Sequence, residues 1–225
     1  INNENGRASR ATEVSYQDQI TRIYDWIKSL QDAGYLLNYG TDGTNTVSGF
    51  TQQQIGMFIA SSASARNVID SSEFEVGVAP LPVPEGVEAQ GVYAGGGALA
   101  AGMDEQTEAG VMAFFEYVTS PEVQAEWASG TGYFPICHGA YETETMQNTY
   151  AELPQLEVAA QQLLNSQVNS ITAGPLLSQL PQLRTDLQSA LEAVFNGSDV
   201  ASAVEQAVSN TNSAITSANE GVANG

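Results

Sequence analysis

The chain of 225 residues carries 26 acidic residues against six basic ones, a formal net charge of −20. This balance excludes the basic patch that a nucleic-acid-binding protein needs, and it disfavours attraction to an anionic membrane surface. One cysteine, Cys137, and one histidine, His138, exclude an intrachain disulfide, a thiolate cluster and a multi-histidine metal site. We therefore expect no metal and no cofactor.

The composition is also typical of a surface adapted to high salt. Lys28 is the only lysine, and dissolved salt screens the repulsion between the many acidic side chains. The polar start of the chain, residues 1–5, is unlike a signal peptide, so an exported protein would be represented here by a mature or truncated form.

The first predicted element is an amphipathic helix between Glu13 and Ala33, where apolar residues recur at threes and fours. Gly34 is expected to end it. The next stretch, Asn38–Gly49, is rich in turn residues and is predicted to be a loop. Met57–Ala60 is a short apolar run with the length of a strand.

This predicted strand leads to Ser61 and Ser62, which precede a helix predicted over Ala63–Ile69. Free backbone N–H groups and the positive end of a helix dipole favour anionic or strongly accepting ligand groups at such a position. The alternative is that one of the two serines merely caps the helix. The sequence alone leaves both interpretations open.

Two further segments are predicted to be extended. Phe74–Pro82 alternates apolar and polar residues and is closed by prolines. Val92–Ala100 contains a glycine triplet inside an apolar run, which lets a ligand or another chain segment approach the backbone closely. A strand with a bulge is the alternative for this second segment.

A helix is predicted over Glu105–Val118, with acidic residues in its first turn. We interpret Asp104, Glu105 and Glu108 as capping and solvating residues, because acids favour the positive end of the helix dipole. They are not predicted to form a catalytic carboxylate pair.

A shorter helix is predicted from Pro121 towards Ser129, with Ser120 as its N-cap. Gly130 and Gly132 are expected to end it, since glycine accepts the left-handed backbone that closes a helix. Tyr133 is then presented at the exit of a tight turn. A rigid aromatic ring with a hydroxyl suits ligand contact there, and a tyrosine packed at a loop edge is the alternative.

Beyond this turn, Glu142 and Glu144 lie in a polar stretch and are expected to face water. Helices are predicted over Glu152–Val168 and over Leu176–Val194, and Pro181 either kinks or restarts the second one.

Asn196 and Gly197 are expected to end that second helix. Ser198 or Asp199 caps a last helix, and the tail, 219–225, is predicted to be frayed.

In the same order, these segments resemble the receptors of carbohydrate-importing ABC transporters, most closely the glycerol-3-phosphate-binding branch. The resemblance rests on the following motifs as they stand here: the stretch from Phe50 to Met57, Ser61-Ser62, Phe74-x-Val76-Gly77 with Leu81-Pro82, Trp127 with Thr131-Gly132-Tyr133-x-Pro135, Ala140-Tyr141, and Pro181-x-Leu183-Arg184.

The resemblance implies an α/β fold of the two-lobed periplasmic-binding-protein kind, class II. Residues 1–92 and 136–225 would form most of the C-terminal lobe, and 93–135 would belong to the other lobe and the hinge. Such receptors have a long upstream half, which we expect to be absent from these 225 residues.

The resemblance also implies roles for individual residues. Ser61, Ser62 and Tyr133 would lie in the ligand cleft, and Gly96 would lie against the ligand. Arg184 would grip the ligand's phosphate, a role that the forked guanidinium suits. A surface pair of Arg184 with Asp186 or Gln188 is the alternative.

The function implied is capture of glycerol-3-phosphate or a glycerophosphodiester and its delivery to the membrane subunits of an ABC transporter. We expect a monomer that is periplasmic or extracellular, with or without a lipid anchor at the cell surface. It would have no catalytic residues and would close around its ligand by a hinge.

Three alternatives remain at this point. A neutral mono- or oligosaccharide would be held by Tyr93, Trp127 and Tyr133. A hydrolase using Ser61 or Ser62 lacks a convincing base, because His138 is the only candidate. An acidic structural surface protein would also fit the composition.

Overall fold

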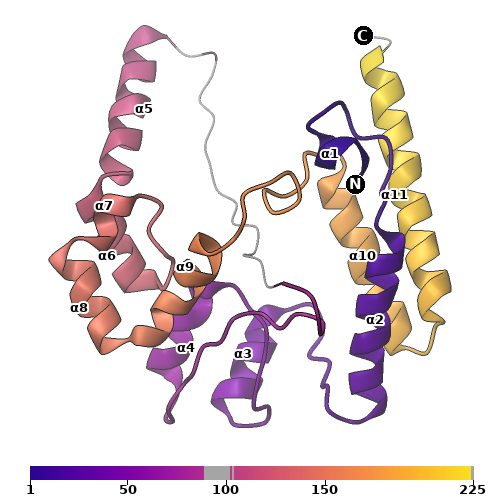
Figure 1. Ribbon diagram of the computed structural model, residues 1–225, viewed down its shortest axis with the longest axis horizontal. Helices are drawn as coiled ribbons and strands as arrows, with labels where there is room; N and C mark the ends of the chain where they lie inside the picture. The colour runs from indigo at the N-terminus through magenta and orange to yellow at the C-terminus, as the bar shows by residue number, and fades with distance from the viewer. Residues whose placement is uncertain (89–101, 103, 224–225) are drawn as a thin grey trace. The chain divides into compact units, whose positions relative to one another are not determined.

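The computed structural model describes residues 1–88, 102 and 104–223, and all regular secondary structure in this part is helical (Figure 1). Among these residues, every helix is too short or too polar to span a bilayer. The predicted glycine-rich segment Val92–Ala100, with Gly96, lies outside the described residues.

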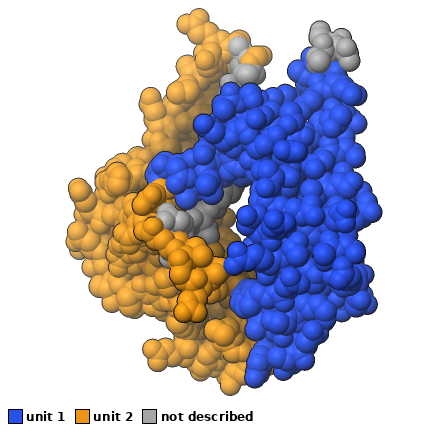
Figure 2. Space-filling view, turned by 45° about the vertical axis from the view of Figure 1, so that its right-hand side comes forward, with its two compact units in different colours: residues 1–40, 168–225 blue, residues 41–167 orange. Residues whose placement is uncertain are grey.

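The chain divides into two compact units, which Figure 2 shows in different colours. Unit 1 comprises Ile1–Gly40 and Val168–Gly225, and unit 2 comprises Thr41–Gln167. The lobe boundaries implied by the resemblance, 1–92 with 136–225 against 93–135, refer to a complete receptor and stay a prediction.

Three long helices build unit 1: α2 (Gln17–Asp32), α10 (Leu180–Phe195) and α11 (Val200–Ala223). They lie side by side in Figure 1, and α11 runs back along α10 after a short connection. Their apolar stripes face one another, which is how amphipathic helices bury apolar surface. The core includes Ile20, Tyr24, Leu183, Ala190, Val194, Val204, Ala207, Val208 and Ile215.

Two polar contacts fix the helices of unit 1 against one another. The Tyr24 hydroxyl donates to the Leu187 carbonyl at 2.7 Å, and burial raises the pKa of this phenol. The fully buried Thr211 hydroxyl donates to the Asp186 carboxylate at 2.8 Å. Both contacts satisfy groups that would be costly to bury without a partner.

The N-terminal segment of unit 1 holds the loop that precedes α10. In α1 (Asn2–Gly6) three consecutive residues from Asn3 have left-handed backbone angles, which side chains other than glycine rarely adopt. Arg7 donates to the carbonyls of Ala173 and Gly174 at 3.0 and 2.6 Å. This arginine therefore closes the turn at 170–174 by gripping its backbone.

Unit 2 contains shorter helices. They are α3 (Gly43–Thr51), the 3₁₀ helix η1 (Ser62–Ser64), α4 (Ala65–Ser71), α5 (Glu105–Val118), α6 (Pro121–Thr131), α7 (His138–Tyr141), α8 (Glu144–Glu152), the 3₁₀ helix η2 (Pro154–Leu156) and α9 (Glu157–Leu164). A small core lies around α6 and α8 and consists of Ala125, Ala128, Ala140 and Met146. A second cluster joins the rings of Phe50, Phe58 and Phe74.

Two of the three predicted extended segments of unit 2, Met57–Ala60 and Phe74–Pro82, lie in the described residues, and neither forms the predicted strand. Phe74, Val76 and Val78 are nevertheless partly buried and alternate with exposed residues, as the pattern predicts. A strand exists only when its backbone pairs with a neighbour, and an alternating pattern cannot supply that neighbour.

Local capping explains two helices that the sequence analysis missed. The loop predicted over Asn38–Gly49 is wrong, because α3 begins at Gly43 and the Asp42 carboxylate accepts from the Thr44 N–H at 2.9 Å. This hydrogen-bonding to Thr44 lowers the pKa of Asp42. Thr143 caps α8 in the same way through the Met146 N–H, at 3.2 Å.

Most of the long predicted helices exist, with changes at their ends. Pro181 lies in the first turn of α10, so it starts the helix and does not kink it. The helix predicted over Glu152–Val168 is shorter than predicted: α8 ends at Glu152, Pro154 begins η2, and α9 ends at Leu164. Gly130 lies inside α6, and Gly132 alone caps that helix.

The end of unit 1 differs from the prediction in one respect. Asn196 and Gly197 follow α10 and Asp199 caps α11, as expected, with the Ser202 N–H 2.9 Å from the Asp199 carboxylate. The tail predicted to fray from Asn219 is helical to Ala223. The Asn219 amide donates to the Ala11 carbonyl at 2.9 Å, which ties the last turns to the N-terminal segment.

We expect Ile215→Ala to destabilise unit 1 by roughly 2–5 kcal/mol, because it opens a cavity at a fully buried position. Val222→Ala on the same helix is the control, since Val222 is 62% exposed and should change stability by less than about 0.5 kcal/mol. Urea unfolding measures both. Equal effects of the two changes would contradict the core described above.

Candidate functional site

Ser61 and Ser62 lie where the extended segment after α3 enters η1. The Ser61 hydroxyl accepts from the Ala63 N–H at 3.3 Å, and the Ser61 carbonyl accepts from the Ser64 N–H at 3.0 Å. Ser61 is therefore the cap of this helical turn, which was the simpler of the two interpretations. The side chain of partly buried Ser62 makes no hydrogen bond within the described part of the chain.

Tyr133 lies directly after the end of α6. Gly132 caps the helix with φ +87°, and its N–H donates to the Ala128 carbonyl at 2.9 Å. The Thr131 hydroxyl accepts from the Tyr133 N–H at 3.3 Å, which fixes the first peptide after the turn. The Tyr133 side chain is 49% exposed, so its ring and hydroxyl are accessible to a ligand.

The end of α6 lies against the start of η1 and α4. A Cβ atom at Gly132 would come within 3.1 Å of the Ser62 carbonyl oxygen and 2.9 Å of the Arg66 backbone nitrogen. The two predicted parts of the site, Ser62 and Tyr133, are therefore joined within unit 2 through Gly132. They are brought together by backbone contact although they are distant in sequence.

Ala140 and Tyr141, the pair that belongs to the motif, lie after Tyr133 and pack within unit 2. Ala140 is fully buried, and the Tyr141 hydroxyl donates to the Pro135 carbonyl at 2.9 Å. Burial raises the pKa of the Tyr141 phenol further above its ordinary value. Tyr141 thus supports the backbone just beyond Tyr133.

Arg66 is a neighbour of this junction that the sequence analysis did not identify. Its Nε lies 2.8 Å from an Asp70 carboxylate oxygen, and its Nη1 donates to the Ser129 carbonyl at 3.3 Å. The Ser129 hydroxyl in turn accepts from Thr149 at 2.9 Å. One signal was available in the sequence: Arg66 is the only basic residue of unit 2, which has sixteen acidic ones.

Arg184 belongs to unit 1, whereas Ser61, Ser62 and Tyr133 belong to unit 2. It lies on α10, is exposed, and has no hydrogen bond or ion pair with any residue that the structure describes. The alternative surface pair with Asp186 does not form. The Asp186 carboxylate instead accepts from Gln182 at 2.9 Å and from Thr211 at 2.8 Å.

Cys137 and His138, the only thiol and the only imidazole in the sequence, are adjacent in unit 2. Cys137 is a free, partly buried thiol that packs against the small core around α6, and the neighbouring His138 is exposed. No group of three potential metal ligands occurs among the described residues. Gly96 and Tyr93 lie outside those residues, and their roles stay predictions.

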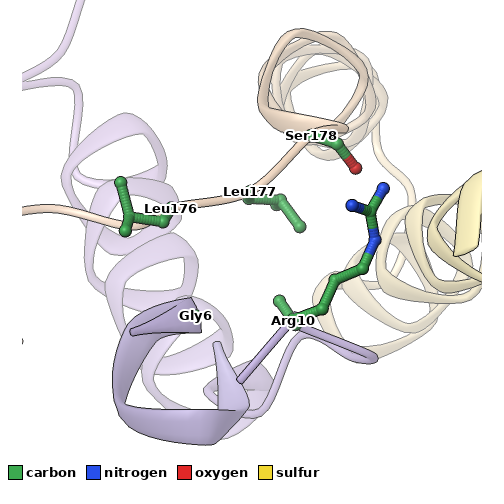
Figure 3. A pocket seen from close by; sticks show the side chains of 6 residues that line it. Gly6, Arg10, Leu176, Leu177 and Ser178 are labelled. Atoms are coloured by element: carbon green, nitrogen blue, oxygen red, sulfur yellow. The ribbon is translucent and has the colours of Figure 1, made fainter. Parts of the chain in front are cut away.

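Unit 1 has a shallow pocket of about 270 Å³ (Figure 3). Its lining residues are Gly6, Arg10, Ala11, Leu176, Leu177 and Ser178. The Arg10 guanidinium extends towards Ser178 in Figure 3, and its Nε donates to the Asn219 side chain. None of the predicted site residues lines this pocket, so the candidate site remains the junction around Gly132.

Comparison with known proteins places this geometry in context. Residues 6–156 match the model of a family described as bacterial extracellular solute-binding protein. The chain is 37% identical over 142 residues to the sn-glycerol-3-phosphate-binding periplasmic protein UgpB of Yersinia pseudotuberculosis, an alignment that covers 61% of this chain and 32% of that protein. For UgpB of Salmonella typhimurium the identity is 34% over 152 residues, with 66% and 35% covered.

A solved structure is also similar. It is the crystal structure of UgpB from Mycobacterium tuberculosis in complex with glycerophosphocholine, with a TM-score of 0.73 and 22% sequence identity. The match covers 88% of this chain and 49% of that one, and it shows a shared fold. The alignments with the two UgpB sequences above show that the chain spans about a third of the length of these curated relatives. These matches confirm the resemblance that the motifs indicate.

We expect Gly132→Ala to destabilise unit 2 by roughly 1–3 kcal/mol, because alanine is strained at φ +87° and its Cβ would collide with backbone atoms. Gly130→Ala is a matched control two residues earlier, inside α6, where a Cβ would meet no atom within 4 Å. It should stabilise the protein by about 0.5–1 kcal/mol, since alanine is the better helix former. Urea unfolding distinguishes the two, and equal changes would contradict the described junction.

Proposed function

The chain belongs to the family of bacterial extracellular solute-binding proteins, and we propose that the protein containing it is the receptor of an ABC importer for glycerol-3-phosphate or a glycerophosphodiester. Two similar proteins are named as sn-glycerol-3-phosphate-binding, and the similar crystal structure contains glycerophosphocholine. In this proposal the receptor works in the periplasm or at the cell surface, as a monomer. It captures its ligand between two lobes of a class II fold and passes it to the membrane subunits.

The observation that carries the proposal is the junction at Gly132. It brings Ser62, whose hydroxyl has no protein partner in the described part, to the same part of unit 2 as the half-exposed Tyr133. Hydroxyl groups and an aromatic ring are suitable contacts for the glycerol part of such a ligand. The capping role of Ser61 leaves Ser62 as the better candidate of the two for ligand contact.

The phosphate requires positive charge, and unit 2 supplies little of it. Unit 2 carries sixteen acidic residues and one arginine, and Asp70 already pairs with that arginine. A phosphate bound to unit 2 alone would be repelled, so its cation must come from elsewhere. Arg184 of unit 1 is exposed and unpaired within the described residues, which fits the proposed phosphate contact.

A neutral mono- or oligosaccharide is the second candidate ligand. Trp127 and Tyr133 are 60% and 49% exposed and lie on the last turns of α6 and just beyond it. Exposed aromatic rings at the end of one helix can stack on sugar rings without any need for a cation. The response of binding to the loss of Arg184 separates the two ligands.

We expect Arg184→Ala to weaken binding of glycerol-3-phosphate to the full-length protein by at least tenfold. Removing one partner of a buried, hydrogen-bonded charge pair costs roughly 2–5 kcal/mol, and tenfold in affinity is about 1.4 kcal/mol. Arg184→Lys should restore part of the affinity, because an ammonium keeps the charge but lacks the fork. Calorimetric titration measures both variants.

Arg22→Ala is the control for this measurement, since Arg22 is an exposed arginine of α2 in the same unit with no described hydrogen bond or ion pair. It should leave the affinity unchanged. Titration with a glycerophosphodiester and with a neutral disaccharide completes the comparison. If Arg184→Ala binds its ligand as tightly as the unchanged protein, the sugar receptor is the better assignment.

The proposal includes no chemistry on the ligand. The Ser61 hydroxyl accepts from the Ala63 N–H as the cap of η1. The exposed His138 begins α7, which is a different segment of unit 2. We expect the full-length protein to hydrolyse neither phosphate esters nor glycosides, as measured by product release over hours. Hydrolysis that is lost in Ser62→Ala would identify an enzyme and refute the receptor assignment.

A further inference from the structure

Arg66 connects the two segments that meet at Gly132. It lies on the first turn of α4, one turn after Ser62, and its backbone nitrogen and Cβ lie against Gly132. Its guanidinium crosses to α6 and donates to the carbonyl of Ser129, near the end of that helix. The last four carbonyls of a helix lack partners within it, so an arginine is a suitable donor there.

We propose that Arg66 is a positioning residue of the ligand site, which holds the Gly132–Tyr133 turn at a fixed distance from Ser62. The inference rests on the proposed function only where it concerns ligand affinity. The Asp70 carboxylate holds the Nε edge of the guanidinium at 2.8 Å and thereby directs the Nη1 group towards Ser129. The planar fork makes these two contacts at once, which a lysine ammonium at the same position cannot do with the same geometry.

The ion pair between Arg66 and Asp70 does not explain the arrangement by itself. The two side chains are 34% and 53% exposed, and exposed pairs four residues apart on a helix contribute little. The contact that crosses between helices is the bond to Ser129, whose hydroxyl is fixed by Thr149 of α8. Arg66 therefore joins α4 to the packed part of unit 2 around α6 and α8.

The test uses Arg66→Met in the full-length protein, because methionine keeps much of the side-chain length without the guanidinium. Two quantities are measured: amide hydrogen exchange of peptides that cover 129–133, and affinity for glycerol-3-phosphate by calorimetric titration. We expect faster exchange in 129–133 and affinity weaker by about tenfold. Exchange in α11, in the other unit, should stay unchanged.

Three further variants identify the cause. Arg22→Met makes the same change of charge at an exposed arginine without described partners and should alter neither quantity. Asp70→Asn removes the charge of the ion pair but keeps an oxygen that can accept from the Arg66 Nε. The guanidinium should therefore stay directed towards Ser129, and exchange and affinity should stay near those of the unchanged protein. Arg66→Lys keeps the charge without the fork and should resemble Arg66→Met.

The outcomes separate this inference from the proposed function. Unchanged exchange in Arg66→Met overturns the positioning role, whatever the protein binds. Faster exchange with unchanged affinity, in a protein that binds glycerol-3-phosphate, overturns it as well. Full recovery in Arg66→Lys overturns the role of the fork and assigns the effect to charge. If the unchanged protein does not bind glycerol-3-phosphate, the proposed ligand is wrong and the exchange result still decides whether Arg66 holds the turn.

Discussion

The candidate site depends on the absence of a side chain at Gly132. Its left-handed backbone ends α6, and its open face lets the backbone of Ser62 and Arg66 approach to a distance that any Cβ would prevent. A helix end and a helix start therefore meet directly through main-chain atoms. Backbone atoms have no rotamers, so such a contact fixes the separation of the attached side chains better than a side-chain contact would.

The sequence predicted elements whose signals are local. The period of apolar residues identified α2, α5, α10 and α11, and the turn residues Gly34 and Gly197 marked where helices end. It failed at Phe74–Pro82, because an alternating pattern cannot show whether a neighbouring strand exists. It also failed at α3, where the signal was local: the Asp42 cap lies within a polar stretch, Asn38–Gly49, that was interpreted as a loop.

The site was predictable to different degrees. Ser62 and Tyr133 could be named from motifs, and the capping role of Ser61 was one of the two interpretations that the sequence left open. Their meeting through Gly132 is a tertiary contact that no local pattern encodes. Arg66 belongs to no motif used here, and its importance becomes visible only when its contacts to Asp70 and Ser129 are known. The only signal in the sequence was that Arg66 is the single basic residue of unit 2, beside sixteen acidic ones.

The uneven charge of the two units limits how the proposed site in unit 2 could recognise a phosphate. Unit 1 has ten acidic and five basic residues, whereas unit 2 has sixteen and one. Because Asp70 and the Ser129 carbonyl occupy the guanidinium of Arg66, this cation can order the site but contributes little free positive charge to it. Under the proposed function, unit 2 would offer hydroxyl and aromatic groups to the neutral part of a ligand, and the cation for a phosphate would have to come from outside unit 2.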